Sequence, residues 1–100
     1  MISVNVTFIG KEVKSLTVSG HANYDKYGKD IVCAGVSAVV TGGINALEEQ
    51  VNNIEIINED NKLGVKVINS NDKIQIILNT ILVQLQTIEN SYKKYIKIKR

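Results

Sequence analysis

Cys33 and His21 are the only thiol and the only imidazole in the chain. A thiolate can attack an acyl carbon, and an imidazole can carry the proton to and from the leaving group, so this pair is sufficient for a cysteine hydrolase. His21 follows a predicted strand and Cys33 begins a predicted helix, with an irregular, glycine-containing loop over residues 22–29 between them. We therefore predict that this loop folds back and brings the two side chains within hydrogen-bond reach.

The residues around Cys33 are those that stabilise a thiolate. Asp30 is a suitable N-cap, because its carboxylate can accept hydrogen bonds from the unpaired amides of the next turn. A helix that begins after Asp30 places Cys33 at its third position, where free amides and the positive end of the helix dipole favour an anion. These amides, including those of Cys33 and Ala34, are expected to bind the oxyanion of a tetrahedral intermediate. Ser37, one turn further on the same face, is expected to hydrogen-bond into the site.

Each of these residues also has a purely structural interpretation. A lone cysteine in an apolar helix is often a small buried hydrophobe, and a lone histidine after a strand is often a turn or surface residue. For Asp30, a capping role alone and an orienting role toward His21 are equal alternatives. The Ser37 side chain is also interpreted as a hydroxyl that interacts only within its own helix, ahead of a catalytic role. Tyr24 and Tyr27 are interpreted as loop-packing residues ahead of substrate contacts, with partial exposure.

The composition restricts the class of protein. At 100 residues and 11.0 kDa, with 44% hydrophobic residues, the chain has the size and apolar content of one domain spanning residues 1–100. A net charge of +2 and 22% charged residues exclude an acidic disordered chain and a strongly basic nucleic-acid binder. One cysteine and one histidine cannot form a disulfide or complete a zinc site, so we expect no metal and no cofactor.

Neither the N-terminal segment nor the longest charge-free run indicates a membrane protein. Residues 1–10 alternate in polarity and lack the basic region of a signal peptide, which predicts a cytoplasmic location. Residues 31–47 form the longest charge-free run, but this run is too short and too rich in glycine and polar residues for a membrane span. We expect it to form a buried helix.

Hydrophobic periodicity predicts five strands and two helices. Alternation predicts strands over residues 2–8, 13–19, 54–59, 63–69 and 95–99, with Phe8 on the buried face of the first. Helical spacing predicts one helix from Asp30 through Val51 and a second that is capped by Asn71 or Asp72. The order is ββαββαβ, which predicts an α+β fold with a mixed or antiparallel sheet packed with two helices. A stripe of small residues on the first helix predicts close backbone approach there: Gly35, Ala38, Gly42 and Ala46. The glycines inside this helix, Gly35, Gly42 and Gly43, predict packing that a larger side chain would block.

Two surface features bear on whether the protein associates with a second copy of itself or with RNA. The second helix carries apolar residues outside its main stripe, Ile76 and Val83, which favours a homodimer. Five basic residues gather near the C-terminus, namely Lys93, Lys94, Lys97, Lys99 and Arg100. We interpret this cluster as protection of an edge strand ahead of contact with RNA, and we do not expect direct RNA binding.

One segment of the chain resembles a known protein family. Its residues are Gly20-His21-Ala22-x-Tyr24, followed by Gly28-x-Asp30-Ile31-Val32-Cys33-Ala34-x-Val36-Ser37, and they are similar to those of the ribosomal-processing cysteine protease (Prp) family. The chain length and the ββαββαβ order are also similar, whereas Gly35 stands where family members often carry alanine. The resemblance implies that Cys33 is the nucleophile and His21 the proton-transfer residue, with supporting roles for Asp30 and Ser37.

The resemblance also implies a substrate. It predicts a homodimeric protease that removes a short N-terminal extension from the twenty-seventh protein of the large ribosomal subunit, so that the ribosomal protein precursor is its partner. Two alternatives stay open. One is a thiol hydrolase or acyl-transfer enzyme that uses the same dyad on another substrate. The other is a non-enzymatic, ribosome-associated binding module whose basic C-terminal strand contacts RNA.

Overall fold

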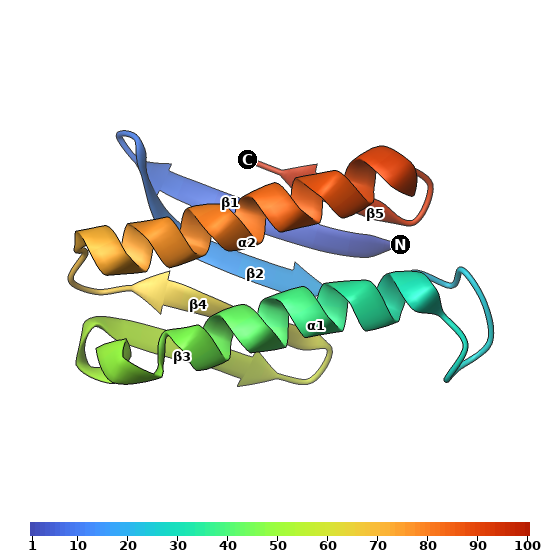
Figure 1. Ribbon diagram of the computed structural model, residues 1–100, viewed down its shortest axis with the longest axis horizontal. Coiled ribbons are helices and arrows are strands. Elements are labelled where there is room, and N and C mark those ends of the chain that lie inside the picture. The colour runs from blue at the N-terminus through green and yellow to red at the C-terminus, as the bar shows by residue number, and fades with distance from the viewer.

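The protein is described by a computed structural model that covers residues 1–100, and its elements follow the predicted ββαββαβ order (Figure 1). They are β1 (Ile2–Ile9), β2 (Glu12–Ser19), α1 (Ile31–Ala46), β3 (Ile54–Glu59), β4 (Lys62–Val67), α2 (Asp72–Ser91) and β5 (Ile96–Lys99). A short 3₁₀ helix, Glu48–Asn53, connects α1 to β3. The predicted fold class, a small α+β domain with two main helices, is confirmed.

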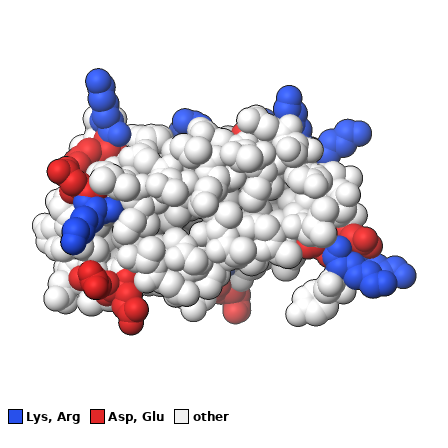
Figure 2. All heavy atoms as spheres, viewed as in Figure 1, with Lys and Arg blue, Asp and Glu red and all other residues white.

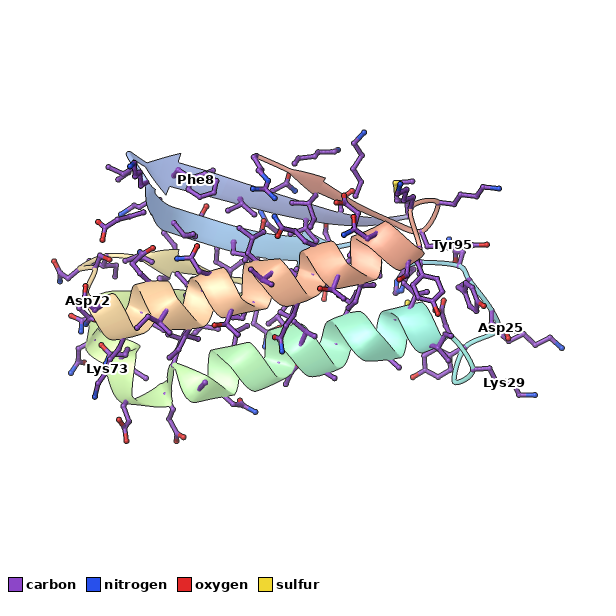
Figure 3. All side chains as sticks on the ribbon, turned by 45° about the horizontal axis from the view of Figure 1, so that its top comes forward. Phe8, Asp25, Lys29, Asp72, Lys73 and Tyr95 are labelled. Atoms are coloured by element: carbon purple, nitrogen blue, oxygen red, sulfur yellow. The ribbon has the colours of Figure 1, made fainter.

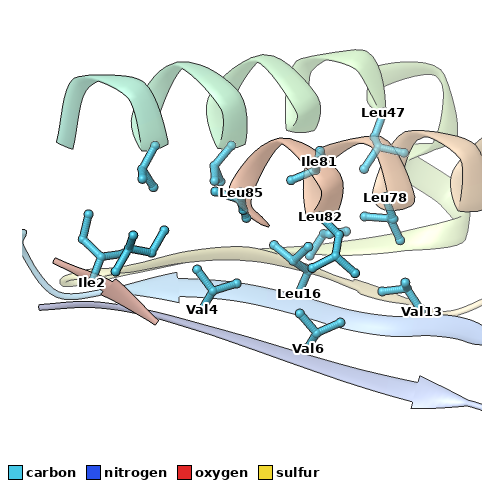
Figure 4. Packing of buried hydrophobic residues seen from close by; sticks show 14 of the residues in the cluster. Ile2, Val4, Val6, Val13, Leu16, Leu47, Leu78, Ile81, Leu82 and Leu85 are labelled. Carbon is cyan, nitrogen blue, oxygen red and sulfur yellow. The ribbon is translucent and has the colours of Figure 1, made fainter. Parts of the chain in front are cut away.

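The five strands form one mixed sheet in the order β3-β4-β2-β1-β5. β5 runs parallel to β1, and all the other neighbours are antiparallel. Both helices lie side by side on the same face of the sheet (Figure 1), with α1 against β4 and α2 against β2 and β5. Nineteen buried hydrophobic residues fill the space between helices and sheet (Figure 4). This apolar layer holds the start of α1 in a fixed position beside the end of β2.

A β-bulge interrupts the hairpin of β1 and β2. Thr7 pairs with Ser15 and Phe8 with Val13, so that Lys14 is the extra residue on β2. The predicted burial of Phe8 is wrong, since its side chain is 38% exposed. β5 pairs only with the first half of β1, which leaves the region of Phe8 at an open edge of the sheet. The side chain of Gln75 in α2 ties the hairpin down by binding both the N–H and the carbonyl of Val13, at 2.8 and 2.9 Å.

Helix α1 ends earlier than its sequence pattern predicts. It stops at Ala46, and Val51 lies in the 3₁₀ helix with its side chain 58% exposed, so the predicted continuation is wrong. The cap residue Leu47 leaves the helical conformation with ψ 6°, and its fully buried side chain instead joins the core. Packing of Leu47 thus overrides the continued helical spacing.

The predicted close packing on α1 is confirmed at Gly43 and is wrong at Ala38, Gly42 and Ala46. Ala38, Gly42 and Ala46 are exposed, and a Cβ added at Gly42 would meet nothing within 4 Å. At Gly43, which the sequence predicts as a site of tight packing, an added Cβ would overlap the side chain of Ile81 in α2. Of the stripe, only Gly35 lies beside α2, where an added Cβ would be 3.7 Å from the Cδ1 of Ile88.

Helix α2 follows its predicted pattern closely. Asn71 is its N-cap and accepts a hydrogen bond from the Ile74 N–H at 2.9 Å. Its apolar stripe is buried, namely Ile74, Leu78, Ile81, Leu82 and Leu85. Ile76 and Val83 project outward and are exposed. Neither α1 nor α2 combines the length and apolar character that a membrane crossing requires.

Candidate active site

Cys33 lies in the first turn of α1, at the position that the capping pattern predicts. The Asp30 carboxylate Oδ1 accepts a hydrogen bond from the Cys33 N–H at 3.0 Å, so Asp30 is the N-cap and Cys33 the third helical residue. The thiol is free and half-buried. Its Sγ accepts a hydrogen bond from the backbone N–H of Ala22 at 3.4 Å. This donor comes from the far end of the loop between His21 and Cys33.

His21 lies two residues after the end of β2 and is exposed. Gly20, which precedes it, has φ +87°, and a Cβ added there would lie 2.5 Å from the Met1 carbonyl oxygen. Only glycine therefore fits this turn without strain. The turn directs the chain so that His21 and Cys33 line one cavity, and the predicted hydrogen-bond reach between their side chains stays a prediction. No hydrogen bond joins the imidazole to the thiol in this conformation.

Asp30 joins the loop to the helix with its two carboxylate oxygens. While Oδ1 caps the helix, Oδ2 accepts a hydrogen bond from the Tyr24 N–H at 3.0 Å. Partial desolvation raises the pKa of Asp30, but hydrogen bonds from the Cys33 and Tyr24 N–H groups, from the Cys33 side chain and from the Asp25 N–H outweigh it, and the net pKa is lowered. Asp30 is therefore ionised at neutral pH, and its contacts are with the loop backbone and the helix start.

The amides expected to bind an oxyanion are not available in this structure. The Cys33 N–H donates to Asp30 Oδ1, and the Ala34 N–H donates to the Asp30 carbonyl at 3.0 Å. That sequence prediction is wrong for this conformation, because the cap takes the Cys33 donor and the first i→i−4 bond of the helix takes the Ala34 donor. The amide that does reach the sulfur, from Ala22, lies outside the helix, and nothing in the spacing of the sequence indicates it.

The cavity beside Cys33 has a volume of about 750 Å³. Its walls are the loop after β2, the first half of α1, and the turn between β3 and β4. Ser37 lines it one helical turn after Cys33, and Thr41 lies a further turn along the same wall. The distance along the helix from Cys33 to Thr41 is ~12 Å, which matches roughly three or four residues of extended peptide.

The third wall of the cavity was missed by sequence reasoning. It consists of residues at the β3–β4 turn: Asn58, Glu59, Asn61 and Lys62. The positive φ of Asn61, 61°, marks a hairpin turn, and the sequence does predict that turn. What the sequence does not show is that the turn lies across from the start of α1. No group of three or more His, Cys, Asp or Glu side chains in the protein is arranged to hold a metal ion.

A thiol held at a helix start, inside a groove that accommodates a short stretch of extended polypeptide, is the arrangement of a cysteine protease. The comparisons with known proteins agree with this class. The chain belongs to the cysteine protease Prp family, whose family model matches residues 1–97.

Several relatives and solved structures resemble the chain over nearly its whole length. A ribosomal processing cysteine protease Prp from Staphylococcus aureus is 42% identical, with 98% of this chain and 97% of the relative covered. The protein of that name from Bacillus subtilis is 30% identical, with coverage of 88% and 86%. A crystal structure of the S. aureus protease with a covalently linked product peptide has a TM-score of 0.91 at 36% identity, covering 99% and 98% of the two chains. A structure of the same protease with a substrate peptide has a TM-score of 0.85.

Proposed function

We propose that this protease is a cytoplasmic endopeptidase that removes the N-terminal extension from the twenty-seventh protein of the large ribosomal subunit. The observation that carries the proposal is the hydrogen bond from the Ala22 N–H to the Cys33 sulfur inside a peptide-sized groove. The names of the relatives, which describe ribosomal processing, support the choice of substrate. The S. aureus structures with bound peptides support a polypeptide in the groove.

In the proposed reaction, Cys33 Sγ attacks the carbonyl carbon of the scissile peptide bond. The new S–C bond forms as the carbonyl electrons move to oxygen, and the C–N bond then breaks as His21 protonates the departing amine. The N-terminal extension is left as a thioester on Cys33. Water attacks this thioester while His21 accepts a proton, and the C–S bond breaks to release the extension as a carboxylate and to restore the thiolate.

Asp30 and Ser37 have supporting roles in this proposal. Asp30 carries no proton at neutral pH and holds the loop to the helix start, which keeps the Ala22 N–H on the sulfur. This amide stabilises the thiolate before attack, because a hydrogen bond to an ionised acceptor is about twice as strong as one between neutral groups. Ser37 lies on the wall of the groove next to the nucleophile, where its hydroxyl can bind the backbone of a bound peptide.

The test is cleavage of a synthetic peptide that copies the extended N-terminus of the ribosomal protein. We expect the protease to cut it at one bond, detected by mass spectrometry, and to leave a scrambled peptide of the same composition intact. His21→Ala and Cys33→Ala are expected to remove cleavage without a change in the far-ultraviolet circular dichroism spectrum. If the wild-type protein fails to cut the copied peptide but hydrolyses a simple thioester or ester, the thiol hydrolase alternative replaces this proposal.

The binding-module alternative makes a different prediction. It requires RNA binding that decreases with salt, that survives Cys33→Ala, and that weakens when the C-terminal lysines are neutralised. The structure supports the edge-strand interpretation of these lysines, since β5 is the outermost strand of the sheet and pairs only with β1.

We also propose that the protease is a homodimer that associates through the exposed face of α2. Residues 74–88 of this helix carry no charge, and Ile76 and Val83 are 66% and 58% exposed. Figure 2 shows that the face formed by the two helices is almost free of charged side chains, which lie around its rim. Sedimentation equilibrium is expected to give twice the chain mass for the wild type and the single chain mass for Val83→Lys. A monomeric wild type would contradict the proposal.

A further inference from the structure

Tyr24, in the loop between His21 and Cys33, packs against two tyrosines from the C-terminal part of the chain. Its ring lies edge-on to that of Tyr92, with centroids 5.5 Å apart and an interplanar angle of 90°, and to that of Tyr95, at 5.0 Å and 78°. Such T-shaped pairs are a preferred geometry of aromatic rings. Figure 3 shows Tyr95 at the same end of the molecule as Asp25 and Lys29 of the loop. We call these three rings the tyrosine cluster.

The two C-terminal tyrosines form a fixed support. Tyr92 caps α2, with its N–H donating to the Ile88 carbonyl at 2.9 Å. The Tyr95 N–H donates to the Tyr92 carbonyl at 2.9 Å, and the Tyr95 carbonyl accepts from the Ile2 N–H at 2.8 Å. The support is therefore bonded to α2 on one side and to β1 on the other. Both tyrosines are only half exposed or less and pack against the hydrophobic core.

The segment 22–24 connects this support to the nucleophile. At one end the Tyr24 ring contacts the support, and the Tyr24 N–H binds Asp30 Oδ2. At the other end the Ala22 side chain is 3% exposed, and the Ala22 N–H binds Cys33 Sγ. Three residues thus carry contacts to the C-terminal support, to the helix cap and to the thiol.

None of the three tyrosines lines the groove, although Asn23 and Asp25 on either side of Tyr24 do. The Tyr24 ring therefore points away from the space that a substrate would occupy, and its removal takes nothing from the walls of the groove. Any effect of Tyr24 on the chemistry has to pass through the backbone of the loop.

We propose that the tyrosine cluster is a positioning device that holds the Ala22 N–H on the Cys33 sulfur, and that Tyr24, Tyr92 and Tyr95 are positioning residues of the protease. The inference rests on the proposed role of Cys33 as the nucleophile. It assigns a function to the C-terminal turn, which is remote from Cys33 in sequence and forms no hydrogen bond with it. Loosening the turn releases segment 22–24, removes the amide from the sulfur and makes the sulfur less reactive.

The experiment compares Tyr24→Ala, Tyr95→Ala and Tyr24→Phe with the control Phe8→Ala. Phe8 has nearly the same exposure as Tyr24, 38% against 40%, and lies at the opposite end of the molecule (Figure 3). The first readout is the rate at which iodoacetamide alkylates Cys33 at pH 7. Because the thiol already lines an open cavity, this rate reports on the state of the sulfur and not on its access. The second readout is kcat and KM for the ribosomal peptide.

We expect Tyr24→Ala and Tyr95→Ala each to slow alkylation roughly two- to tenfold, the range that corresponds to an aromatic pair. Both variants should lower kcat by a similar factor with little change in KM, because no groove residue is altered. Tyr24→Phe should keep most of the wild-type rate, since the ring contacts need no hydroxyl. The double variant of Tyr24 and Tyr95 should be no slower than the worse single variant, because both act through one contact.

Unchanged or faster alkylation in Tyr24→Ala would overturn the proposal, as would equal slowing in Phe8→Ala. If Tyr24→Ala does not fold, Tyr24→Leu, which keeps most of the packed volume, replaces it. Slower alkylation in Tyr24→Leu would then support the proposal, and unchanged or faster alkylation would overturn it. The alkylation readout does not need a substrate. A wild-type protein that fails to cut the ribosomal peptide therefore contradicts the proposed substrate, while the alkylation rates still decide the role of the tyrosine cluster.

Discussion

Substitution of Gly20 by alanine tests how the backbone sets the position of His21. Gly20 and Gly28 bracket the loop of the active site and have nearly the same conformation, with φ +87° and +85°. They differ in their surroundings, since a Cβ at Gly20 would lie 2.5 Å from the Met1 carbonyl oxygen and one at Gly28 would meet nothing within 4 Å. Gly28→Ala is therefore a matched control for the conformational part of the effect.

The expected magnitudes follow from these surroundings. An alanine in the left-handed region costs about 1–2 kcal/mol at either position, partly offset by the reduced entropy of the unfolded chain. At Gly20 the overlap with a backbone atom adds about 1–3 kcal/mol. The Met1 carbonyl belongs to the same peptide unit as the Ile2 N–H, which is bonded to the Tyr95 carbonyl, so it cannot rotate away as a side chain can. Gly20→Ala should thus be less stable than Gly28→Ala by about 1–3 kcal/mol, which corresponds to roughly 5–20 °C in Tm for a domain of this size.

Urea denaturation followed by circular dichroism measures the difference in free energy of unfolding between the two variants, provided that their m-values agree. A larger loss of stability in Gly20→Ala supports the interpretation that the end of β2 packs tightly on the start of β1 and fixes the direction of the loop. Equal destabilisation by the two substitutions would refute it, because the Met1 contact would then contribute nothing.

Three further predictions concern α1, its cap and the groove. Gly42→Ala should raise the free energy of unfolding by up to about 1 kcal/mol through helix propensity. The free energy of unfolding of Gly43→Ala should be lower than that of Gly42→Ala by about 1–3 kcal/mol, because the new Cβ overlaps a buried isoleucine of α2. Equal melting temperatures of the two variants would contradict this. Because the folded pKa of Asp30 is lowered, its stabilising effect is present above the ordinary carboxyl pKa and is lost as the pH falls through the lowered value. The wild type should therefore exceed Asp30→Asn in stability at pH 7 and converge with it in acid, and a gap that is constant with pH in urea titrations would disprove the reasoning. Thr41→Arg should raise KM for the peptide severalfold by filling the groove while leaving alkylation of the thiol unchanged, and an unchanged KM would show that the peptide does not extend that far.

The parts of the fold that local sequence determines were predictable. Asp30 and Asn71 cap the two helices as their side-chain chemistry indicates, and Cys33 falls in the first turn for the same reason. The strands follow the period-2 alternation because one face of each is covered by the helices. Local pattern failed where packing decided the outcome: Val51 lies outside α1, and Phe8 lies at an uncovered edge.

The candidate site was predictable only in part. The thiol and the imidazole were found because each residue type occurs once, and the loop between them is short enough to bring them to one cavity. Three features depend on contacts between segments far apart in the chain or on backbone direction. They are the wall from the β3–β4 turn, the Ala22 N–H on the sulfur, and the contact of Tyr24 with the C-terminal support. A single sequence contains no spacing that reports such contacts.

The central claim is that Cys33 forms a covalent bond with the peptide during cleavage. Its most direct test is intact-mass spectrometry of the protease, quenched in acid within the first turnover of the ribosomal peptide. The account predicts an adduct whose mass is that of the protein plus the N-terminal fragment less one water, located on Cys33 and absent from Cys33→Ala. Cleavage of the same bond by Cys33→Ala at the wild-type rate, with no adduct on either protein, would contradict it.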